Sequence, residues 1–239
     1  MNTSHEPPRL SQSRLASLRN AVGAWMLGCI LGFVCFVLVG DQLRGMSDPL
    51  WAAVWWQLSF GVGLALIQGV IVAVTRIQHS SLAEIGWQKP TSLKAIIGGV
   101  ILGGLYVTGV YAGILNDPSM RNVNPFALKG IRFFLIPLGV FMAVAEETLM
   151  RGYFMTQLSK ASVPPWAQIV LSGACSATYH SFHNLTWIGF IPSFVLFSLH
   201  AFLYVSGKRS LTPSIIAHSM YHVLCAPYLL MFAMAQTAT

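Results

Sequence analysis

Charged side chains are scarce in this sequence, and acidic ones are the scarcest. Only 9% of the 239 residues are Asp, Glu, Lys or Arg, and seven of those are acidic. By contrast, 55% are hydrophobic and the mean hydropathy is +0.64. Soluble domains usually carry about 25% charged residues. The composition therefore excludes an ordinary soluble domain and indicates a membrane protein.

Cysteine is also rare, and its placement excludes two common roles. Cys29, Cys35, Cys175 and Cys225 all lie in apolar segments, and no two of them have the CxxC spacing. Neither a disulfide framework nor a zinc knuckle is compatible with this pattern. We expect the four thiols to pack as small buried hydrophobic groups.

The net charge of +7 does not indicate a nucleic-acid partner, because the basic residues do not form a cluster with aromatic or groove-reading elements. Their distribution instead follows the positive-inside rule if the N-terminus is cytoplasmic. Of the 14 Lys and Arg, Arg151 lies within an apolar segment. The predicted cytoplasmic residues are Arg9, Arg14, Arg19, Arg76, Lys89, Lys94, Lys160, Lys208 and Arg209, and those on the other side are Arg44, Arg121, Lys129 and Arg132.

Apolar segments that approach the length of a membrane crossing, about 20 residues, follow one another along the chain. They cover about 24–40, 51–75, 94–116, 132–157, 165–183, 185–206 and 211–235. Backbone groups in lipid must bond within their own segment, which favours helices over an open sheet. We predict an all-α, polytopic transmembrane bundle of seven to eight membrane helices with a central polar cavity.

The first 23 residues contain three arginines and are followed by a hydrophobic run without a small-residue cleavage site. This pattern is typical of a retained signal-anchor. We predict a cytoplasmic tail over 1–23 and one integral membrane domain over 24–239, in the inner (cell) membrane of a bacterium. Within that domain, Gly99 and Gly103 form a GxxxG motif, which predicts close helix packing.

Two adjacent glutamates, Glu146 and Glu147, interrupt one of the apolar segments. Charge near a bilayer centre costs at least ~2.5 kcal/mol per residue, so such residues usually face a cavity and carry function. Glu147 and Arg151 are four residues apart and share a helical face, where they can pair. Glu146 and Arg151 diverge by about 140°. The pair accounts for one glutamate, and Glu146 is left for chemistry.

Histidines are concentrated in the last three apolar segments. His218 and His222 share a helical face one turn apart. Counting ~1.5 Å per residue from the cytoplasmic edge places Glu146 and His222 at the same depth, ~21 Å, with His218 about one turn shallower. We therefore expect His180, His218 and His222 to converge with Glu146, and we interpret His200 as a helix–helix hydrogen bonder.

Glutamate and histidine in a water-accessible membrane cavity can hydrolyse a peptide bond in two ways. In one, His180, His218 and a carboxylate hold Zn²⁺, which activates a bound water. In the other, Glu146 takes a proton from water while His218 and His222 donate hydrogen bonds to the oxyanion. The residues leave both open. The sequence has no His-Glu-x-x-His, no GxSxG around a candidate serine and no separated pair of membrane aspartates.

Two motifs resemble a known family. Residues 146–151 have the form Glu-Glu-x-x-x-Arg, and a Leu-x-Pro turn at 211–213 precedes His218-x-x-x-His222. Over about residues 130–225 the chain resembles the CPBP family, the intramembrane glutamic or metallo-endopeptidases of CAAX processing and bacteriocin processing, which are related to Ras-converting enzyme. The resemblance implies an intramembrane endopeptidase that uses Glu146 to activate water.

The second motif of that family, Phe-x-x-x-His, has two candidates here. Four residues before His180 stands Ser176, and four before His183 stands Tyr179. The spacing to the next motif and the flanking residues favour His180, with His183 as the alternative. The family has Asn or Asp where this chain has His222, which can still donate a hydrogen bond, with a charge and tautomer that depend on pH.

The resemblance implies a complete set of site residues and partners. The catalytic residues are Glu146, Glu147, Arg151, His180, His218 and His222, and the residues for a Zn²⁺ cofactor are Glu146, His180 and His218, with His183 in place of His180 as the alternative. The implied partners are a peptide or protein substrate, lipid-modified in true CAAX processing, and the bilayer, with no nucleic acid. The alternative function is a non-catalytic membrane scaffold or bacteriocin self-immunity protein of the same fold. A haem or quinone protein is disfavoured, because the histidines do not form two facing pairs.

Overall fold

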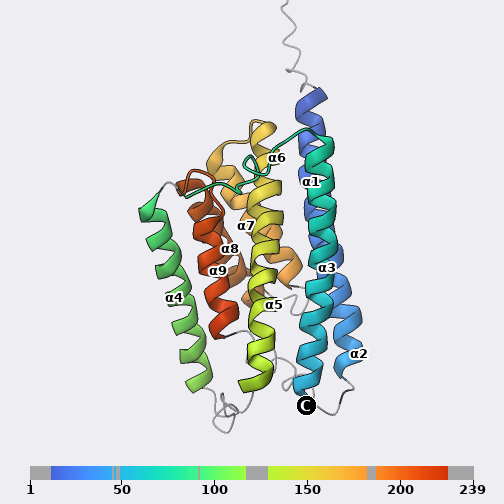
Figure 1. Ribbon diagram of the computed structural model, residues 1–239, viewed down its shortest axis with the longest axis vertical. Coiled ribbons are helices and arrows are strands. Elements are labelled where there is room, and N and C mark those ends of the chain that lie inside the picture. The colour runs from blue at the N-terminus through green and yellow to red at the C-terminus, as the bar shows by residue number, and fades with distance from the viewer. Residues whose placement is uncertain are drawn as a thin grey trace, which may run out of the picture.

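The computed structural model describes residues 12–44, 46, 49–90, 92–116, 129–181 and 187–225. All the regular elements within these residues are helical, and they form seven rods that run roughly side by side (Figure 1). The rods are α1 (Gln12–Gly32) continued by η1 (Phe33–Val39) and α2 (Gly40–Arg44); α3 (Pro49–Ile77); α4 (Leu93–Asn116); α5 (Lys129–Glu147) continued by η3 (Thr148–Phe154) and α6 (Met155–Lys160); α7 (Pro165–His180); α8 (Trp187–Ser206); and α9 (Thr212–Leu224). The all-α prediction is confirmed.

Three helical stretches are long and apolar enough to cross a membrane on length and composition alone. They are Gln12–Leu43, Val54–Ile77 and Leu93–Gly113, and Phe190–Ser206 is a shorter apolar stretch. The chain is thus a polytopic transmembrane bundle. Its first helix begins at Gln12, so residues 12–23, predicted as part of a tail, form the first turns of that helix.

The helices with polar residues meet in the middle of the bundle. Helix α9 packs against α4, α5 and α8, while α7 packs against α8 and α1. The segment η3 contacts α1, α3, α7 and α8. The rods that contain η3, α7, α8 and α9 therefore pack around the same part of the interior, and the predicted site residues lie on these rods.

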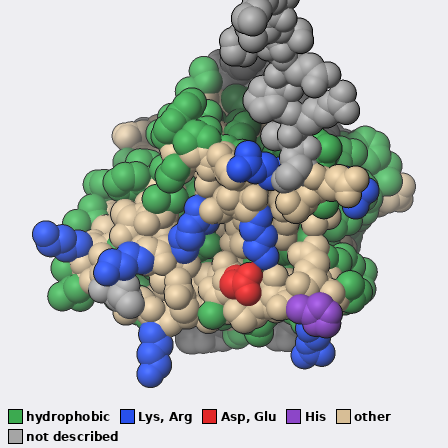
Figure 2. Space-filling view, turned by 90° about the horizontal axis from the view of Figure 1, so that it is seen from above, with side chains coloured by type: hydrophobic (Ala, Val, Ile, Leu, Met, Phe, Trp, Pro, Cys, Tyr) green, Lys and Arg blue, Asp and Glu red, His purple; other side chains and the backbone are tan. Residues whose placement is uncertain are grey.

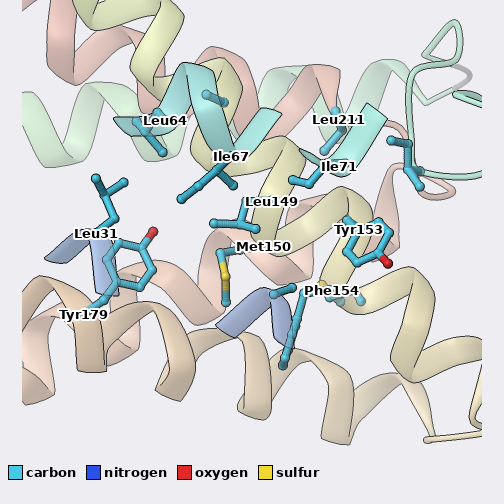
Figure 3. Packing of buried hydrophobic residues seen from close by; sticks show 14 of the residues in the cluster. Leu31, Leu64, Ile67, Ile71, Leu149, Met150, Tyr153, Phe154, Tyr179 and Leu211 are labelled. Carbon is cyan, nitrogen blue, oxygen red and sulfur yellow. The ribbon is translucent and has the colours of Figure 1, made fainter. Parts of the chain in front are cut away.

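One side of η3 is apolar and builds the core. Leu149 and Met150 lie in a cluster with Leu31 of α1 and Leu64 of α3 (Figure 3). Leu149 and Met150 are at most 1% exposed. In a bilayer, helices associate through close packing rather than through burial from water. This dense face fixes η3, so that its other face has a defined direction toward α8 and α9.

The predicted GxxxG packing is confirmed, and α9 is the partner helix. A Cβ atom at Gly103 would lie 3.0 Å from the carbonyl oxygen of Ala217 and 2.8 Å from Sδ of Met220. A Cβ atom at Gly99 would collide with the carbonyl oxygen of Pro213. Only glycine at these two positions lets α4 approach the α9 backbone this closely.

Gly99→Ala is expected to lower the free energy of unfolding by about 2 kcal/mol, because overpacking costs ~1–3 kcal/mol where backbone must move. Gly104→Ala is the matched control: it lies on the same helix and its Cβ would meet nothing within 4 Å. Thermal unfolding in detergent measures both. Equal effects of the two changes would contradict the close approach.

One end of the bundle is polar and carries many basic side chains (Figure 2). Lys160 Nζ donates a hydrogen bond to Ser80 Oγ at 2.8 Å and pairs with Glu84 Oε2 at 3.1 Å. Gln88 Nε2 donates to the carbonyl oxygen of Lys208 at 3.0 Å. The segment after α3, the end of α6 and the turn between α8 and α9 therefore lie at the same end. Lys160 and Lys208 are among the residues predicted to be cytoplasmic, so this is the predicted cytoplasmic end.

Candidate active site

The two glutamates lie where the α-helix α5 widens into the π-helix η3. Such wide turns are rare and often mark functional sites. The wide turn begins directly after Glu147, and it brings Arg151 Nε to 3.4 Å from Glu147 Oε2. Both side chains are 0% exposed. The Glu147–Arg151 pair predicted from the spacing is confirmed.

Glu147 is the centre of a buried cluster that joins three helical rods. Its Oε1 lies 3.0 Å from Nδ1 of His218 on α9 and 3.2 Å from Nδ1 of His200 on α8. Arg151 Nη2 in turn donates a hydrogen bond to the carbonyl oxygen of Phe197 at 2.9 Å, and its Cζ lies 5.2 Å from the centre of the Phe197 ring. A buried carboxylate needs such compensation, because charge without partners is costly in a low dielectric.

Glu146 points to a different helix. Tyr179 of α7 donates its hydroxyl hydrogen to Glu146 Oε2 at 3.1 Å, and His180 Nε2 lies 3.2 Å from the same oxygen. Neither contact uses Oε1. The predicted divergence of the two glutamates is thus present, and Glu146 keeps one oxygen for another group.

The tautomer of His180 follows from its second contact. Its Nδ1 lies 3.0 Å from the carbonyl oxygen of Ser176, which can only accept a hydrogen bond. Nδ1 therefore carries a proton. A hydrogen bond between Nε2 of His180 and the facing carboxylate oxygen of Glu146 requires one further proton. When that proton is on Nε2, Glu146 is ionised.

The side chains of this cluster differ in solvent exposure. The side chain of His180 is 21% exposed, whereas that of Glu146 is 3% exposed and that of Glu147 is 0% exposed. The most exposed of these three side chains is thus His180. The Glu147 carboxylate lies deeper.

His222 also reaches this site. Its ring stacks on His218 with 5.1 Å between the ring centres, and it faces Gly139 of α5. A Cβ atom at Gly139 would lie 2.8 Å from Cβ of His222, so the absence of a side chain there makes room for the imidazole. Its Nδ1 is buried without a hydrogen-bond partner among the described atoms.

The structure gathers all but one of the candidate residues. The residues that it brings together are Glu146, Glu147, Arg151, His180, His218 and His222. His183 lies outside the described residues. His200, interpreted as a helix–helix hydrogen bonder, does contact another helix, at Glu147, but its place in this cluster was not predicted, and neither was that of Phe197. A lone histidine in an apolar segment carries no spacing signal, and a backbone carbonyl carries no signal at all.

A second group of ligands differs from the predicted metal set. One ligand atom each from Glu147, His200 and His218 lies within 4.8 Å of the others. The contacts of 3.0 and 3.2 Å are close to the ~3.3 Å that separates two ligands on a tetrahedral zinc. Nδ1 of His200 makes its 3.2 Å contact with Glu147 without hydrogen-bond geometry, so its lone pair is available to a metal ion. One carboxylate with two imidazoles therefore fits Zn²⁺ in chemistry, although Arg151 already compensates Glu147. The predicted set of Glu146, His180 and His218 shares only His218 with this group, and it stays a prediction.

Comparison with known proteins identifies the segment that builds this site. Residues 129–224 match the family described as Rce1-like, type II CAAX prenyl endopeptidase. No curated protein and no solved structure matched the chain. The matched segment runs from the start of α5 to the end of α9 and contains every residue of the cluster around Glu146 and Glu147. Over this segment, the chain is similar to the Rce1-like family of CAAX prenyl endopeptidases.

Proposed function

We propose that this protein is an intramembrane endopeptidase in which Glu146 activates the water that attacks the peptide bond. The match of residues 129–224 to a CAAX endopeptidase family supports a membrane protease in general terms. The observation that carries the residue-level proposal is the geometry of Glu146. Both contacts that Glu146 makes with Tyr179 and His180 use the same oxygen, Oε2, which leaves Oε1 for water inside a bundle of membrane helices.

In the proposed first step, Oε1 of Glu146 takes a proton from water, and the resulting hydroxide attacks the carbonyl carbon of the substrate. The proton on Nε2 of His180 keeps Glu146 ionised before this step. Glu146 then delivers the acquired proton to the leaving amine as the carbon–nitrogen bond breaks, which returns the carboxylate to its starting form. A positioned base of this kind typically contributes 10²–10⁴-fold to a rate.

His218 is the proposed donor to the oxyanion. Its Nδ1 is directed at Glu147, which leaves Nε2 for the substrate. A carboxylate behind an imidazole stabilises the doubly protonated ring and holds its orientation. Nε2–H of His218 then donates to the negative oxygen that forms on the substrate, and His222, stacked beside it, is the second candidate donor.

Glu147 and Arg151 are the proposed support for this donor. Arg151 compensates the charge of Glu147, so this second carboxylate does not compete with Glu146 for the proton of water. Glu147 also contacts His200, so α5, α8 and α9 are held together by a single carboxylate. Support of this kind keeps the donor and the base at a fixed separation, on which the rate depends steeply.

A Zn²⁺-dependent route stays the alternative for the same site. Glu146, His180 and His218 are the predicted ligands, and Glu147, His200 and His218 are the ligands that the geometry favours. Zinc would supply Lewis acidity toward a water or a carbonyl oxygen. We favour the route without metal, because Glu147 and the Nδ1 atom of His218 already compensate each other and Arg151 adds a fixed positive charge there.

The proposed substrate is a peptide or protein segment that reaches the site from the bilayer, with a lipid-modified C-terminus as the specific form. The family name supports a prenylated substrate. We propose that the chain lies in the inner membrane of a bacterium with its N-terminus and its basic end in the cytoplasm. The gathering of Lys and Arg side chains at one end supports this orientation (Figure 2).

Chelation tests the choice between the two routes. Purified protein in detergent is assayed with a quenched fluorogenic peptide that ends in a farnesylated CAAX sequence, and with the same peptide lacking the lipid. We expect cleavage of the lipid-modified peptide to continue at an unchanged rate after treatment with 1,10-phenanthroline, with less than stoichiometric metal by mass spectrometry. Loss of cleavage on chelation, with recovery on addition of Zn²⁺, would establish the metal route instead.

The alternative function is a membrane scaffold or self-immunity protein of the same fold. A scaffold would not depend on the catalytic side chains, whereas a protease would. If Glu146→Gln and His218→Ala leave the cellular phenotype intact while Gly99→Ala abolishes it, the fold matters and the chemistry does not. This alternative is supported by His222, which stands where the family has Asn or Asp and so departs from the catalytic pattern.

A further inference from the structure

We infer that Tyr179, held in place by the N-terminal helix, is a positioning residue for Glu146. The inference rests on the proposed function of Glu146 and adds two residues to it. Tyr179 is 1% exposed, so it lies behind the carboxylate and does not touch substrate. Its hydroxyl is the only one, among the described residues, that donates to Glu146.

Tyr179 contacts both members of the Glu146–His180 pair. Its hydroxyl reaches Oε2 of Glu146 at 3.1 Å, and its ring centre lies 4.3 Å from that of His180. The His180 ring also lies 4.4 Å from the ring of Phe197. His180 thus contacts two aromatic rings. The same tyrosine fixes the rotation of the carboxylate and the place of the imidazole.

Helix α1 determines where the Tyr179 ring lies. A Cβ atom at Gly28 would be 3.2 Å from Cδ1 and 3.5 Å from Cε1 of Tyr179, closer than ordinary van der Waals contact for the first. It would also lie 3.8 Å from Leu149 of η3. Tyr179 belongs to the same packed cluster as Leu31, one turn further along α1 (Figure 3). Glycine at position 28 therefore lets the ring occupy the space from which its hydroxyl reaches Glu146.

One of the two residues in this contact, Gly28, lies outside the part of the chain that matches the family. The matched segment begins at residue 129, whereas Gly28 lies on α1. The N-terminal helix of this protein thus takes part in building the active site. A carboxylate that loses the hydroxyl keeps one contact, at His180, and can rotate about its last bond. Misplacement by about 1 Å can cost 10²-fold in rate.

Tyr179→Phe removes the hydroxyl and keeps the ring. We expect kcat on the farnesylated fluorogenic peptide to fall roughly tenfold, which is the effect of a hydrogen bond to a charged group. KM should not change, because the residue does not reach the substrate. The unfolding temperature and the elution volume in detergent report whether the variant is folded. A wild-type kcat for this variant would overturn the inference.

Gly28→Ala tests the role of α1 separately. The added methyl group must displace the Tyr179 ring by a few tenths of an ångström, and we expect roughly a threefold fall in kcat with KM unchanged. Gly23→Ala is the matched control: it is on the same helix, and its Cβ would meet nothing within 4 Å. Its kcat should equal that of the wild type.

The double variant Gly28→Ala with Tyr179→Phe distinguishes positioning from general damage. If α1 acts through the hydroxyl, Gly28→Ala costs no further activity once the hydroxyl is gone. Equal loss in both backgrounds would show that Gly28 affects the enzyme by another path, and would overturn the link. The proposed function fails by a different result, namely unchanged cleavage by Glu146→Gln or no cleavage by the wild type.

Discussion

Glu146→Gln is expected to abolish cleavage of the farnesylated fluorogenic peptide, with kcat lowered roughly 10³-fold. Glutamine has nearly the same shape and can still accept the hydroxyl of Tyr179 through its amide oxygen. It cannot take a proton from water. The substitution therefore removes the base and leaves the packing of a residue that is 2% exposed.

The matched control for this experiment is Glu84→Gln. Glu84 lies outside the bundle, its side chain is 45% exposed, and it pairs with Lys160 at the basic end of the molecule. Its replacement removes the same charge from the chain without reaching the site. We expect wild-type kcat for the control. Retained cleavage by folded Glu146→Gln would reject Glu146 as the base.

Arg151→Met is expected to have the largest effect on stability, about 3–5 kcal/mol of unfolding free energy. Arg151 and Glu147 are both 0% exposed, and removal of the guanidinium leaves a carboxylate in the interior without its fixed counter-charge. Methionine retains much of the side-chain length, so the loss is one of charge and hydrogen bonding. Thermal unfolding and denaturation in a mixed-detergent series measure it.

The double variant Arg151→Met with Glu147→Gln separates charge from packing. A neutral pair in place of a buried ion pair is often nearly as stable as the original. We therefore expect the double variant to be more stable than Arg151→Met alone. Arg76→Met, at the end of α3 on the surface, is the control and should change little. A double variant that is less stable than either single one would contradict the account.

Local spacing was sufficient to predict the relation between the two glutamates. The four-residue step from Glu147 to Arg151 predicted their pairing, and the five-residue step from Glu146 predicted divergence. Both are properties of a single helix, which are decided over one turn. The widening of that helix into η3 was not predictable, because a π-turn depends on what packs against it.

His200 shows where such reasoning ends. In the sequence it is one histidine in an apolar segment, without a polar neighbour at helical spacing. In the structure its Nδ1 lies 3.2 Å from Glu147. The contact depends on the rotation of α8 relative to η3, and that rotation is set by packing across helices that are far apart in sequence.

The glycine motif on α4 was also only partly informative. Gly99 and Gly103 predicted close packing of a helix, which is confirmed, but not which helix. The partner is α9, whose Pro213 and Ala217 carbonyl oxygens lie where side chains would otherwise be. A motif of small residues predicts that another helix packs closely. The identity of that helix depends on the complementary surface, which the motif does not contain.

By itself, the sequence determined that the chain is a bundle of membrane helices. It also determined that Glu147 and Arg151 lie on the same face of one helix and that Glu146 points away from Arg151. These features depend on composition and on contacts within a turn. Only the tertiary structure decided that Tyr179 contacts Glu146 beside the expected His180, that His200 and His218 meet at Glu147, and that Gly28 of α1 contacts Tyr179. The physical reason is that these contacts join helices whose mutual rotation and depth are set by the packing of the whole bundle.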